Sequence, residues 1–332
     1  MQLVTGGTGI VGAHLLHHLT ADGEVRALRR PGSDVQVVER IFRHYGPDHA
    51  GRLARIQWVN GDVHDMPALE DAMTGVHHVF HAAALVSFDP RDARMLRHIN
   101  TQGTANVVNA ALLCGVNRLC HVSSTATMGH RAGSAVDESL PWTPDEHTSG
   151  YAWSKYEAEL EVYRGIAEGL DAVIANPAVV IGPGAPGRSS MSLAERLRNG
   201  TRFHPPGSNG FVDARDVAAG LTRLMEHGST GERYLLVGDH SSYAELFRRY
   251  AEGFGLTAPM HALAPWMLAI AWRIEHLRSL LTGDRPLVTR YTAHSACSQR
   301  SYDTTRARSI GITFRPLQES VYNVVRYLGA GV

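Results

Sequence analysis

The segment GYAWSKYEAE, residues 150–159, carries a phenol and an ammonium four residues apart, at Tyr151 and Lys155. Residues i and i+4 share one face of a helix, so the two side chains can reach the same space. A phenol with its ordinary pKa of about 10 is a poor proton carrier at neutral pH. A neighbouring ammonium lowers that pKa and makes acid–base catalysis feasible. The Y-x-x-x-K pattern also arises by chance on solvated helices, so the pair needs support from the rest of the chain.

A glycine-rich stretch, TGGTGIVG at residues 5–12, lies between an apolar run and a helical pattern. The first glycine permits a tight turn, the second lets backbone approach a pyrophosphate, and the third lets the helix pack closely on the sheet. The helix N-terminus adds unpaired N–H groups and the positive end of its dipole. This strand–turn–helix context separates the stretch from an ordinary glycine loop. It predicts that a dinucleotide is bound by Gly6, Thr8, Gly9, Ile10 and Gly12.

The end of the second apolar run indicates which dinucleotide is preferred. An NAD site usually carries Asp or Glu at this point, to accept hydrogen bonds from the ribose. Here EVRAL (24–28) runs into Arg29 and Arg30 without a carboxylate. Two guanidiniums suit a 2′-phosphate, so the sequence favours NADP, with NAD as the alternative. A solvated basic turn would look the same.

Two further strand ends fit the same crevice. Asp62 in NGDV can accept a hydrogen bond from the adenine amino group, with Val63 beside the ring. The small residues Ala82, Ala83 and Ala84 would let backbone lie against the ribose and phosphates of the cofactor. The segment RLCHV (118–122) is followed by the hydroxyls of Ser123, Ser124 and Thr125. A serine there can hold a substrate oxygen while Tyr151 moves its proton and hydride passes to or from the nicotinamide.

The order of elements predicts how these residues are positioned. Short apolar runs alternate with helical patterns over residues 1–180, which is typical of an α/β Rossmann-type doubly wound parallel sheet. Ligands bind such a sheet at the carboxyl ends of its strands. After Pro177 the chain becomes rich in Gly, Pro and Ser and then mostly helical, with strands expected near 210–217 and 232–238. We therefore expect a dinucleotide-binding domain at 1–180 and a smaller, mostly helical substrate lobe at 181–332, completed by the first domain.

These segments together resemble the extended branch of the short-chain dehydrogenase/reductase superfamily, which is epimerase/dehydratase-like. The resemblance covers nearly the whole chain and rests on TGGTGIVG, NGDV, HAAA, INTQGT, HVSSTATMG, YAWSK, NPAVVIGPG and GFVDARDV, in that order. It implies a catalytic set of Ser124, Tyr151 and Lys155, in which Lys155 also binds the nicotinamide ribose. Ser124 is the better serine because it lies five residues before Gly129.

Other roles follow only from this resemblance. Asn100 is expected to be structural, Pro177 and Val179 to contact the nicotinamide end of the cofactor, and Asp213 to Asp216 to form a substrate-side loop. Ser124 is followed by Thr125, where dehydratases of this branch carry Asp and then Glu, which argues against a sugar dehydratase. A homodimer is expected because related enzymes often pair through the two long helices beside the central strands.

The pattern around Arg29 resembles that of reductases such as dihydroflavonol reductases and 3β-hydroxysteroid dehydrogenases. The sequence therefore predicts reversible reduction of a ketone or aldehyde by NADP(H). The alternative is an NAD-dependent NDP-sugar 4-epimerase, which needs the same three catalytic groups, and a dinucleotide sensor without turnover is a third reading. Trp266, Met267 and Trp272, on a helix expected at 263–282, could line an apolar substrate pocket or pack in the core.

The composition of the chain argues against nucleic acid and membranes as general partners. Thirty-two basic residues balance thirty-two acidic ones, so no global field recruits nucleic acid or an anionic membrane. The helix at 263–282 is too polar to span a bilayer and is expected to be amphipathic, with a role at a membrane surface as the less favoured alternative. Three cysteines without metal-ligand spacing favour a reduced, cytoplasmic setting. His14 and His18 share a helix face that we expect to meet solvent, and His77 and His81, along one predicted strand, are too far apart to share an ion, so no metal site is predicted.

Overall fold

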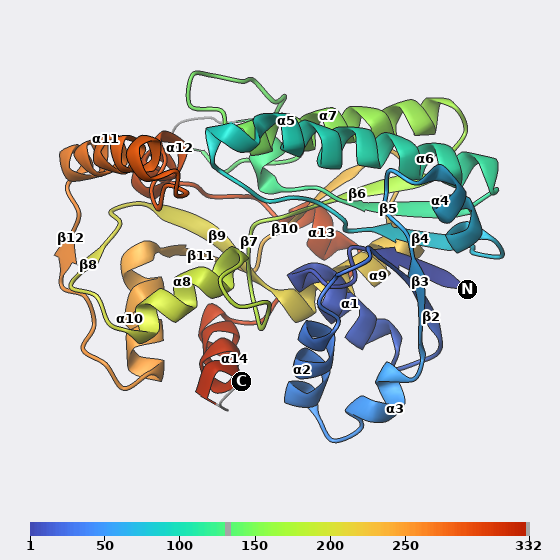
Figure 1. The fold of residues 1–332 in the computed structure, drawn as a ribbon, viewed down its shortest axis with the longest axis horizontal. Coiled ribbons are helices and arrows are strands. Elements are labelled where there is room, and N and C mark those ends of the chain that lie inside the picture. Colours follow the sequence, from blue (N-terminus) through green and yellow to red (C-terminus); the bar gives the residue numbers. More distant parts are fainter. Residues whose placement is uncertain (130–133, 330–332) are drawn as a thin grey trace.

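Seven parallel strands form the main sheet of the computed structural model, which describes residues 1–129 and 134–329. Their order is β10-β6-β5-β4-β1-β2-β3 (Figure 1). The order reverses between β1 and β4, and such a switch point opens a crevice at the carboxyl ends of the strands. The strands are β1 (Gln2–Thr5), β2 (Val25–Arg29), β3 (Ile56–Asn60), β4 (His78–His81), β5 (Arg118–Val122), β6 (Ala172–Pro177) and β10 (Arg233–Leu236).

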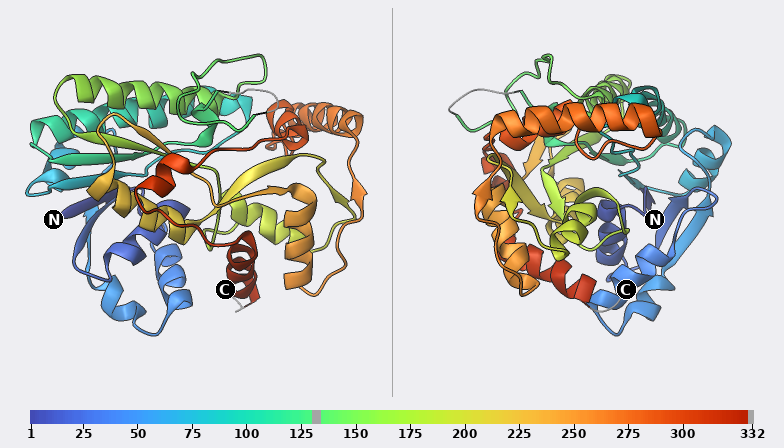
Figure 2. Two further views of the ribbon diagram at one scale, coloured as in Figure 1. Left: turned by 180° about the vertical axis from the view of Figure 1, so that it is seen from behind. Right: turned by 60° about the vertical axis from the view of Figure 1, so that its left-hand side comes forward.

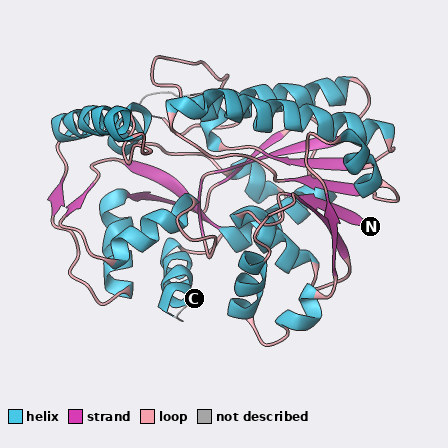
Figure 3. Cartoon of the chain, in the orientation of Figure 1, coloured by secondary structure: helices cyan, strands magenta, loops and turns pink. Residues whose placement is uncertain are grey.

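Helices cover both faces of this sheet (Figures 1 and 3). Side chains alternate between the two faces, as the pleat of a strand requires: Leu3 packs into one hydrophobic cluster and Val4 into the other. One layer contains α1 (Ile10–Leu19), α2 (Gln36–Tyr45) and α9 (Ala214–His227), and the opposite layer contains α4 (Met66–Met73), α6 (Gly103–Leu113) and α7 (Gly150–Ala167). The predicted doubly wound parallel sheet is confirmed.

Short helical segments connect the main elements. Helix α3 (His49–Leu53) follows α2, and α5 (Ala93–Leu96) continues into a π-helical turn, η2 (Arg97–Gln102), before α6. Single 3₁₀ turns, η1 (Pro90–Asp92) and η3 (Thr125–Thr127), follow the β4 and β5 ends. The two 3₁₀ turns therefore lie next to the crevice.

Residues from 179 onward build a smaller mixed region beside the main sheet (Figure 2). One small sheet contains β7 (Val179–Ile181), β9 (Ser208–Asp213) and β11 (Asp239–Ser242), and another contains β8 (Phe203–His204) and β12 (His261–Ala262). The helices are α8 (Ser189–Arg198), α10 (Tyr243–Gly253), α11 (Pro265–Thr282), α12 (Arg290–Cys297), α13 (Thr305–Ser309) and α14 (Leu317–Gly329). Because α9 and β10 from the same stretch join the main sheet, the chain crosses between the two parts, and a division at residue 180 stays a prediction.

The expected helix at 263–282 is α11, but its packing differs from both expectations. Trp266 is 65% exposed, so it neither packs in the core nor lines an enclosed pocket, while Met267 and Trp272 are partly buried. The buried residues of α11 are Leu268 and Ser279. Within the described residues, none of the helices is both long enough and apolar enough to cross a membrane.

Candidate active site

The glycine turn joins β1 to α1 and leaves no room for a side chain at Gly6 or Gly12. Gly6 has φ of +73°, a left-handed conformation, and a Cβ there would lie 2.6 Å from backbone atoms of Ala82 and Ala83. A Cβ on Gly12 would overlap the Gly6 carbonyl oxygen. Gly9 is exposed at the N-terminus of α1, where no side chain caps the helix. The first N–H groups of α1 are therefore available to an anion, and the half-buried Thr8 and Ile10 flank them.

The ends of β2 and β3 bring the predicted adenine-side residues together. Arg29 donates from Nε to Oδ1 of Asn60 at 3.0 Å, and its guanidinium lies 5.7 Å from the centre of the Trp58 ring. Arg30 lies 3.9 Å from the carboxylate of Asp62 and remains largely exposed. The guanidiniums are therefore held at the strand end by neutral or distant partners. Either could meet a phosphate without breaking a buried ion pair.

Val63, the neighbour of Asp62, has a different environment from the one expected. It is 8% exposed and packs under α6, where a Cβ on Gly103 would lie 2.7 Å from its Cγ2. Its side chain supports the loop after β3. Because Val63 packs in the hydrophobic core, it holds the adjacent Asp62 in place beside Arg30.

The loop after β4 is tied down by a buried asparagine. Ala82 and Ala83 are half-buried against the glycine turn, and Ala84 is exposed. Asn100, fully buried, accepts from the Leu85 N–H at 2.7 Å and donates to the Leu85 carbonyl at 2.9 Å. It also donates to Ser154 Oγ on α7 at 2.9 Å. These bonds join the loop, the π-helical turn and α7, which agrees with the structural role expected for Asn100.

Ser124 and Tyr151 meet at the carboxyl end of β5. The Ser124 hydroxyl accepts from the Ala126 N–H at 3.1 Å, so its own proton remains free to donate. The Tyr151 phenol is hydrogen-bonded to Ser124. Burial raises the pKa of Tyr151, and the Ser124 hydrogen bond only partly opposes this shift. The lowered pKa that the sequence predicted for Tyr151 is therefore wrong for the structure, in which burial of the phenol raises it.

Lys155 lies beneath this pair and points into the sheet. It is 1% exposed, and its Nζ donates to the Val122 carbonyl at 2.8 Å and lies 3.3 Å from Nε2 of His121. Burial lowers the pKa of Lys155 to about 8, and the nearby Glu159 carboxyl opposes this shift. The ammonium is thus fixed at the end of β5, one residue before the serine pair.

Two histidines behind Lys155 extend a buried polar chain. His81 is hydrogen-bonded to Thr5 Oγ1 at 2.7 Å and to Thr104 Oγ1 at 3.0 Å, and its ring lies 5.2 Å from that of His121. Burial, and then the Lys155 ammonium, lower the pKa of both histidines, that of His81 to about 3. Both rings are therefore neutral at physiological pH. His81 is not the ordinary strand residue expected from the sequence, and His77 lies just before β4.

Glu159 is hydrogen-bonded to residues at the ends of β5 and β6. The sequence did not predict this role. Its Oε1 accepts from Ser123 Oγ at 2.5 Å, from Thr127 Oγ1 at 2.7 Å and from Asn176 Nδ2 at 2.7 Å. Its other oxygen lies 3.8 Å from the Arg233 guanidinium. The available signal was the spacing, because Glu159 continues the i, i+4 stripe of α7 that begins at Tyr151 and Lys155.

Of the remaining residues predicted at the site, Pro177 and Val179 lie near it, whereas Asp213 and Asp216 do not contribute to it. Pro177 ends β6 and Val179 begins β7, so both follow the strand next to the Ser124 end. Asp213 instead caps α9 and binds Arg215 at 2.7 Å, and Asp216 pairs with Arg315. Asp213 thus stabilises the start of α9, and Asp216 joins α9 to the segment before α14, which corrects the expectation of a substrate-side loop.

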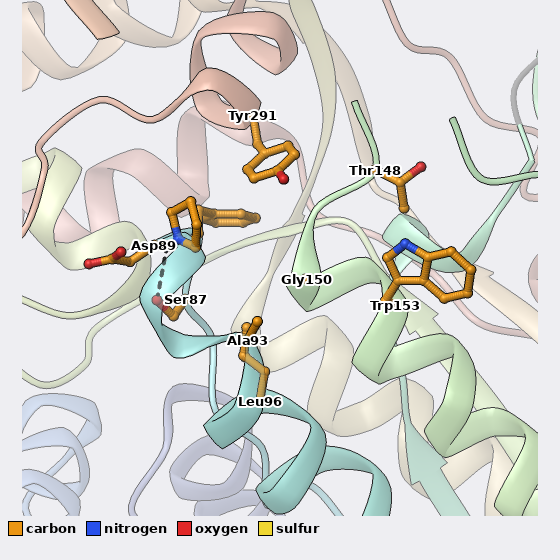
Figure 4. A pocket seen from close by; sticks show the side chains of 10 residues that line it. Ser87, Asp89, Ala93, Leu96, Thr148, Gly150, Trp153 and Tyr291 are labelled. Carbon is orange, nitrogen blue, oxygen red and sulfur yellow. Dashed lines mark hydrogen bonds between the residues drawn. The ribbon is translucent and has the colours of Figure 1, made fainter. Parts of the chain in front are cut away.

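A cavity of about 220 Å³ opens beside the Tyr151 helix (Figure 4). Its aromatic walls are Phe88, Trp153 and Tyr291, and the Phe88 ring is edge-on to the Tyr151 ring at 5.7 Å. The other lining residues are Ser87, Asp89, Pro90, Ala93, Leu96, Thr148 and Gly150. The cavity therefore has aromatic walls and some polar side chains, and Phe88 connects its lining to the Tyr151 ring.

The expected solvent-facing pair on α1 is partly wrong. His14 is 2% exposed and is bonded to the Ile10 carbonyl at 2.7 Å and to the Tyr45 hydroxyl at 2.8 Å, because α2 covers this face of α1. Burial lowers the pKa of His14 to about 4. In the part of the chain that the structure describes, no three His, Cys, Asp or Glu residues gather as a metal site.

Comparison with known proteins agrees with this geometry. Residues 2–237 match the NAD dependent epimerase/dehydratase family. The chain belongs to that family. It is thus an NAD(P)-dependent enzyme of the extended short-chain dehydrogenase/reductase type, as its motifs indicate.

Similar proteins extend the match to almost the full chain. A putative dihydroflavonol 4-reductase from Synechocystis is 31% identical, over 98% of this chain and 93% of its own length. Sterol demethylase protein B from Methylococcus capsulatus is 32% identical, over 80% of this chain and 78% of its own. The crystal structure of gox2253 superposes with a TM-score of 0.81 at 28% identity, covering 99% and 98% of the two chains.

The residues of this family member fit a dinucleotide. The glycine turn offers backbone N–H groups to a pyrophosphate, and Asp62 offers an acceptor at the adenine side. When bound, the nicotinamide supplies or accepts hydride. These residues would hold the cofactor at the switch point, next to the Ser124–Tyr151 pair.

Proposed function

We propose that the protein is an NADP(H)-dependent oxidoreductase that interconverts a carbonyl and a secondary alcohol. The observation that carries this proposal furthest is the end of β2, where Arg29 and Arg30 stand in place of the carboxylate of an NAD site. An enzyme that exchanges NADPH at each turnover suits net reduction. The similarity to a putative dihydroflavonol 4-reductase and to sterol demethylase protein B is consistent with a redox reaction on an apolar substrate.

The proton chemistry follows from the two hydroxyls. Ser124 donates a hydrogen bond to the substrate carbonyl oxygen, because the Ala126 N–H donates to the serine oxygen and leaves the hydroxyl proton available. Tyr151 donates its proton to the same oxygen as hydride reaches the carbon, so one hydride and one proton convert the carbonyl to the alcohol. A raised pKa keeps the phenol protonated until that moment, which suits the reducing direction. The aromatic cavity beside Tyr151 would hold the apolar part of the substrate.

The test compares cofactors in a matched pair of proteins. The native enzyme should consume NADPH with an apolar ketone and use NADH poorly. The Arg29→Asp/Arg30→Ala variant should reverse that preference, because an acceptor for the ribose replaces two phosphate donors. An unchanged ratio of kcat/KM for the two cofactors would rule out the role of the arginines.

An NAD-dependent NDP-sugar 4-epimerase is the alternative, because it uses the same Ser, Tyr and Lys. Such an enzyme would retain NAD through purification and convert UDP-glucose without net redox change. Cofactor released from the denatured native protein therefore separates the two functions. The homodimer, through α6 and α7, and the cytoplasmic setting also stay predictions.

A further inference from the structure

Helix α11 presents a continuous apolar face to solvent. Successive residues turn by about 100° around a helix, so positions 266, 270, 274, 277, 280 and 281 fall within about a third of its circumference. All six are large and apolar, and between 48% and 79% exposed: Trp266, Ile270, Ile274, Leu277, Leu280 and Leu281. We call these six residues the α11 face. Arg273 is the one charged residue within this arc.

The other charges of α11 are turned toward the protein. Arg278 pairs with Glu275 at 3.0 Å and with Asp284 at 3.1 Å, and Glu275 also accepts from the Leu287 N–H at 2.8 Å. Leu268 and Ser279, on the opposite side of the helix, are its buried residues. The orientation of α11 is thus set by polar contacts on its flank, and that orientation leaves the α11 face outward.

The single cation in the arc lies along the helix. Arg273 donates to the Ala269 carbonyl at 2.6 Å, and its guanidinium lies 4.5 Å from the centre of the Trp272 ring. Its aliphatic stem therefore runs beside the apolar residues with the charge at their edge, as in helices that lie at a membrane interface. The other arginines between Thr257 and Tyr291 are in ion pairs: Arg278 with Glu275 and Asp284, Arg285 with Asp92, and Arg290 with Glu146. The guanidinium of Arg273 is therefore the charge on this helix that can meet a lipid phosphate.

The size of the α11 face argues against a second protein copy as its occupant. A helix of 18 residues is about 27 Å long and about 10 Å wide, so one side offers about 300 Å². A stable protein interface needs about 800 Å² on each partner. A bilayer has no such minimum, because each apolar side chain inserted adds to binding. We propose that the α11 face docks on a phospholipid bilayer, with the helix parallel to the surface and Arg273 against lipid phosphates.

This docking has a consequence for the aromatic cavity, which rests on the proposed function. Arg91 donates to the Gly283 and Asp284 carbonyls at the end of α11, and Arg285 pairs with Asp92 at 2.9 Å. The following helix α12 packs on α11 and supplies Tyr291 to the cavity wall. Helix α11, which carries the α11 face, is therefore in contact with two segments that line the cavity, residues 87–93 and α12. A substrate dissolved in the bilayer would reach the cavity without crossing much water.

Docking is tested without turnover, so its outcome does not depend on the proposed reaction. The full-length protein is sedimented with vesicles of phosphatidylcholine and phosphatidylglycerol. The native protein should bind, and the Ile270→Asp/Leu277→Asp variant should partition at least about tenfold less, because two inserted side chains become charged. The matched control is Leu113→Asp/Tyr322→Asp, which makes the same charge change at exposed positions on α6 and α14 and should bind like the native protein.

Three results would overturn the proposal. They are a native protein that stays in the supernatant, an α11 variant that binds as well as the native protein, and a native dimer in lipid-free solution that the α11 variant converts to monomer. A second measurement keeps the proposal testable if the double variant fails to fold. Tryptophan emission of the native protein should shift to the blue on vesicle binding, and Trp266→Phe should remove most of that shift while binding persists. An equal shift in Trp266→Phe would place Trp266 outside the lipid.

Discussion

Burial determines the proton states of the residues around Tyr151. The phenol has a raised pKa and stays protonated at neutral pH, while His81 and His121 are buried as neutral rings. Lys155, with a pKa of about 8, remains mostly an ammonium at pH 7. The site is therefore set up with a proton on the phenol and a positive charge beneath it. In the proposed reaction, the Lys155 ammonium would stabilise the phenolate left behind after the proton is transferred.

Replacement of Tyr151 by phenylalanine removes only the phenol oxygen. We expect kcat to fall by about a hundredfold to ten-thousandfold, the usual contribution of a general acid. Cofactor affinity, measured by fluorescence titration with NADPH, should change little because the ring still packs against Phe88. Turnover within tenfold of the native enzyme would show that another group carries the proton.

At the scale of elements, α7 connects the proposed catalytic residues to the sheet. Tyr151, Lys155 and Glu159 follow one stripe of this helix and contact the ends of β5 and β6. The Glu159 carboxyl holds the segment that carries Ser124 through Ser123 and Thr127. Glu159 is thus a positioning residue for the serine, since it acts on the Ser124 segment through these neighbours.

The Glu159→Gln variant keeps the shape of the side chain and removes its charge. Hydrogen bonds to charged groups contribute about 1.5–3 kcal/mol each, so we expect kcat to fall by about tenfold or more. The alkaline limb of the pH–rate profile should also move to lower pH, because the Glu159 carboxyl raises the pKa of Lys155. Glu161→Gln is the matched control, because Glu161 lies on the same helix and its carboxylate binds Arg164. A pH profile unchanged in Glu159→Gln would leave Glu159 with a purely structural role.

The glycine turn can be tested by comparing alanine substitutions at Gly6 and Gly75. Both place a side chain at a positive φ, so the backbone strain is similar in the two variants. Gly6 and Gly75 both have positive φ, but a Cβ on Gly6 meets the backbone of Ala82 and Ala83, whereas a Cβ on Gly75 meets no atom within 4 Å. Gly75→Ala should cost about 1–2 kcal/mol of unfolding free energy. Gly6→Ala should cost clearly more and weaken NADPH binding, as measured by denaturant titration and fluorescence. Equal losses would show that the turn tolerates a side chain.

The sequence predicted the elements with local signals and missed those that depend on tertiary contacts. The glycine turn, the strand ends and the α7 pair are marked by spacing, and the structure has these elements where the patterns indicate. The burial of His14 by α2, the role of Glu159 and the carboxylates of Asp213 and Asp216 depend on partners far along the chain. The outward face of α11 was also hidden, because an amphipathic pattern does not say which side a protein covers.

At the scale of the whole molecule, burial of Lys155 links global stability to pH. Its pKa is about 8 in the folded protein and 10.5 without perturbation, so between these values the unfolded chain binds more protons. The unfolding free energy of the native protein, relative to Lys155→Met, should therefore rise by about 3 kcal/mol as pH increases from 8 to 10.5. Below pH 8 the difference should be flat, because Lys155 is protonated in both states. A difference that falls as pH rises would contradict a buried lysine with a lowered pKa.

The most direct measurement of the central claim follows the hydride from the cofactor to the substrate carbon. The enzyme is given NADPH deuterated at the transferred position and an apolar ketone, and the alcohol is analysed by mass spectrometry. We predict one deuterium on the carbinol carbon for each NADPH oxidised by the native enzyme, and almost no alcohol from Tyr151→Phe in the same time. An enzyme that retains NAD and converts UDP-glucose without oxidising NADPH would contradict the account.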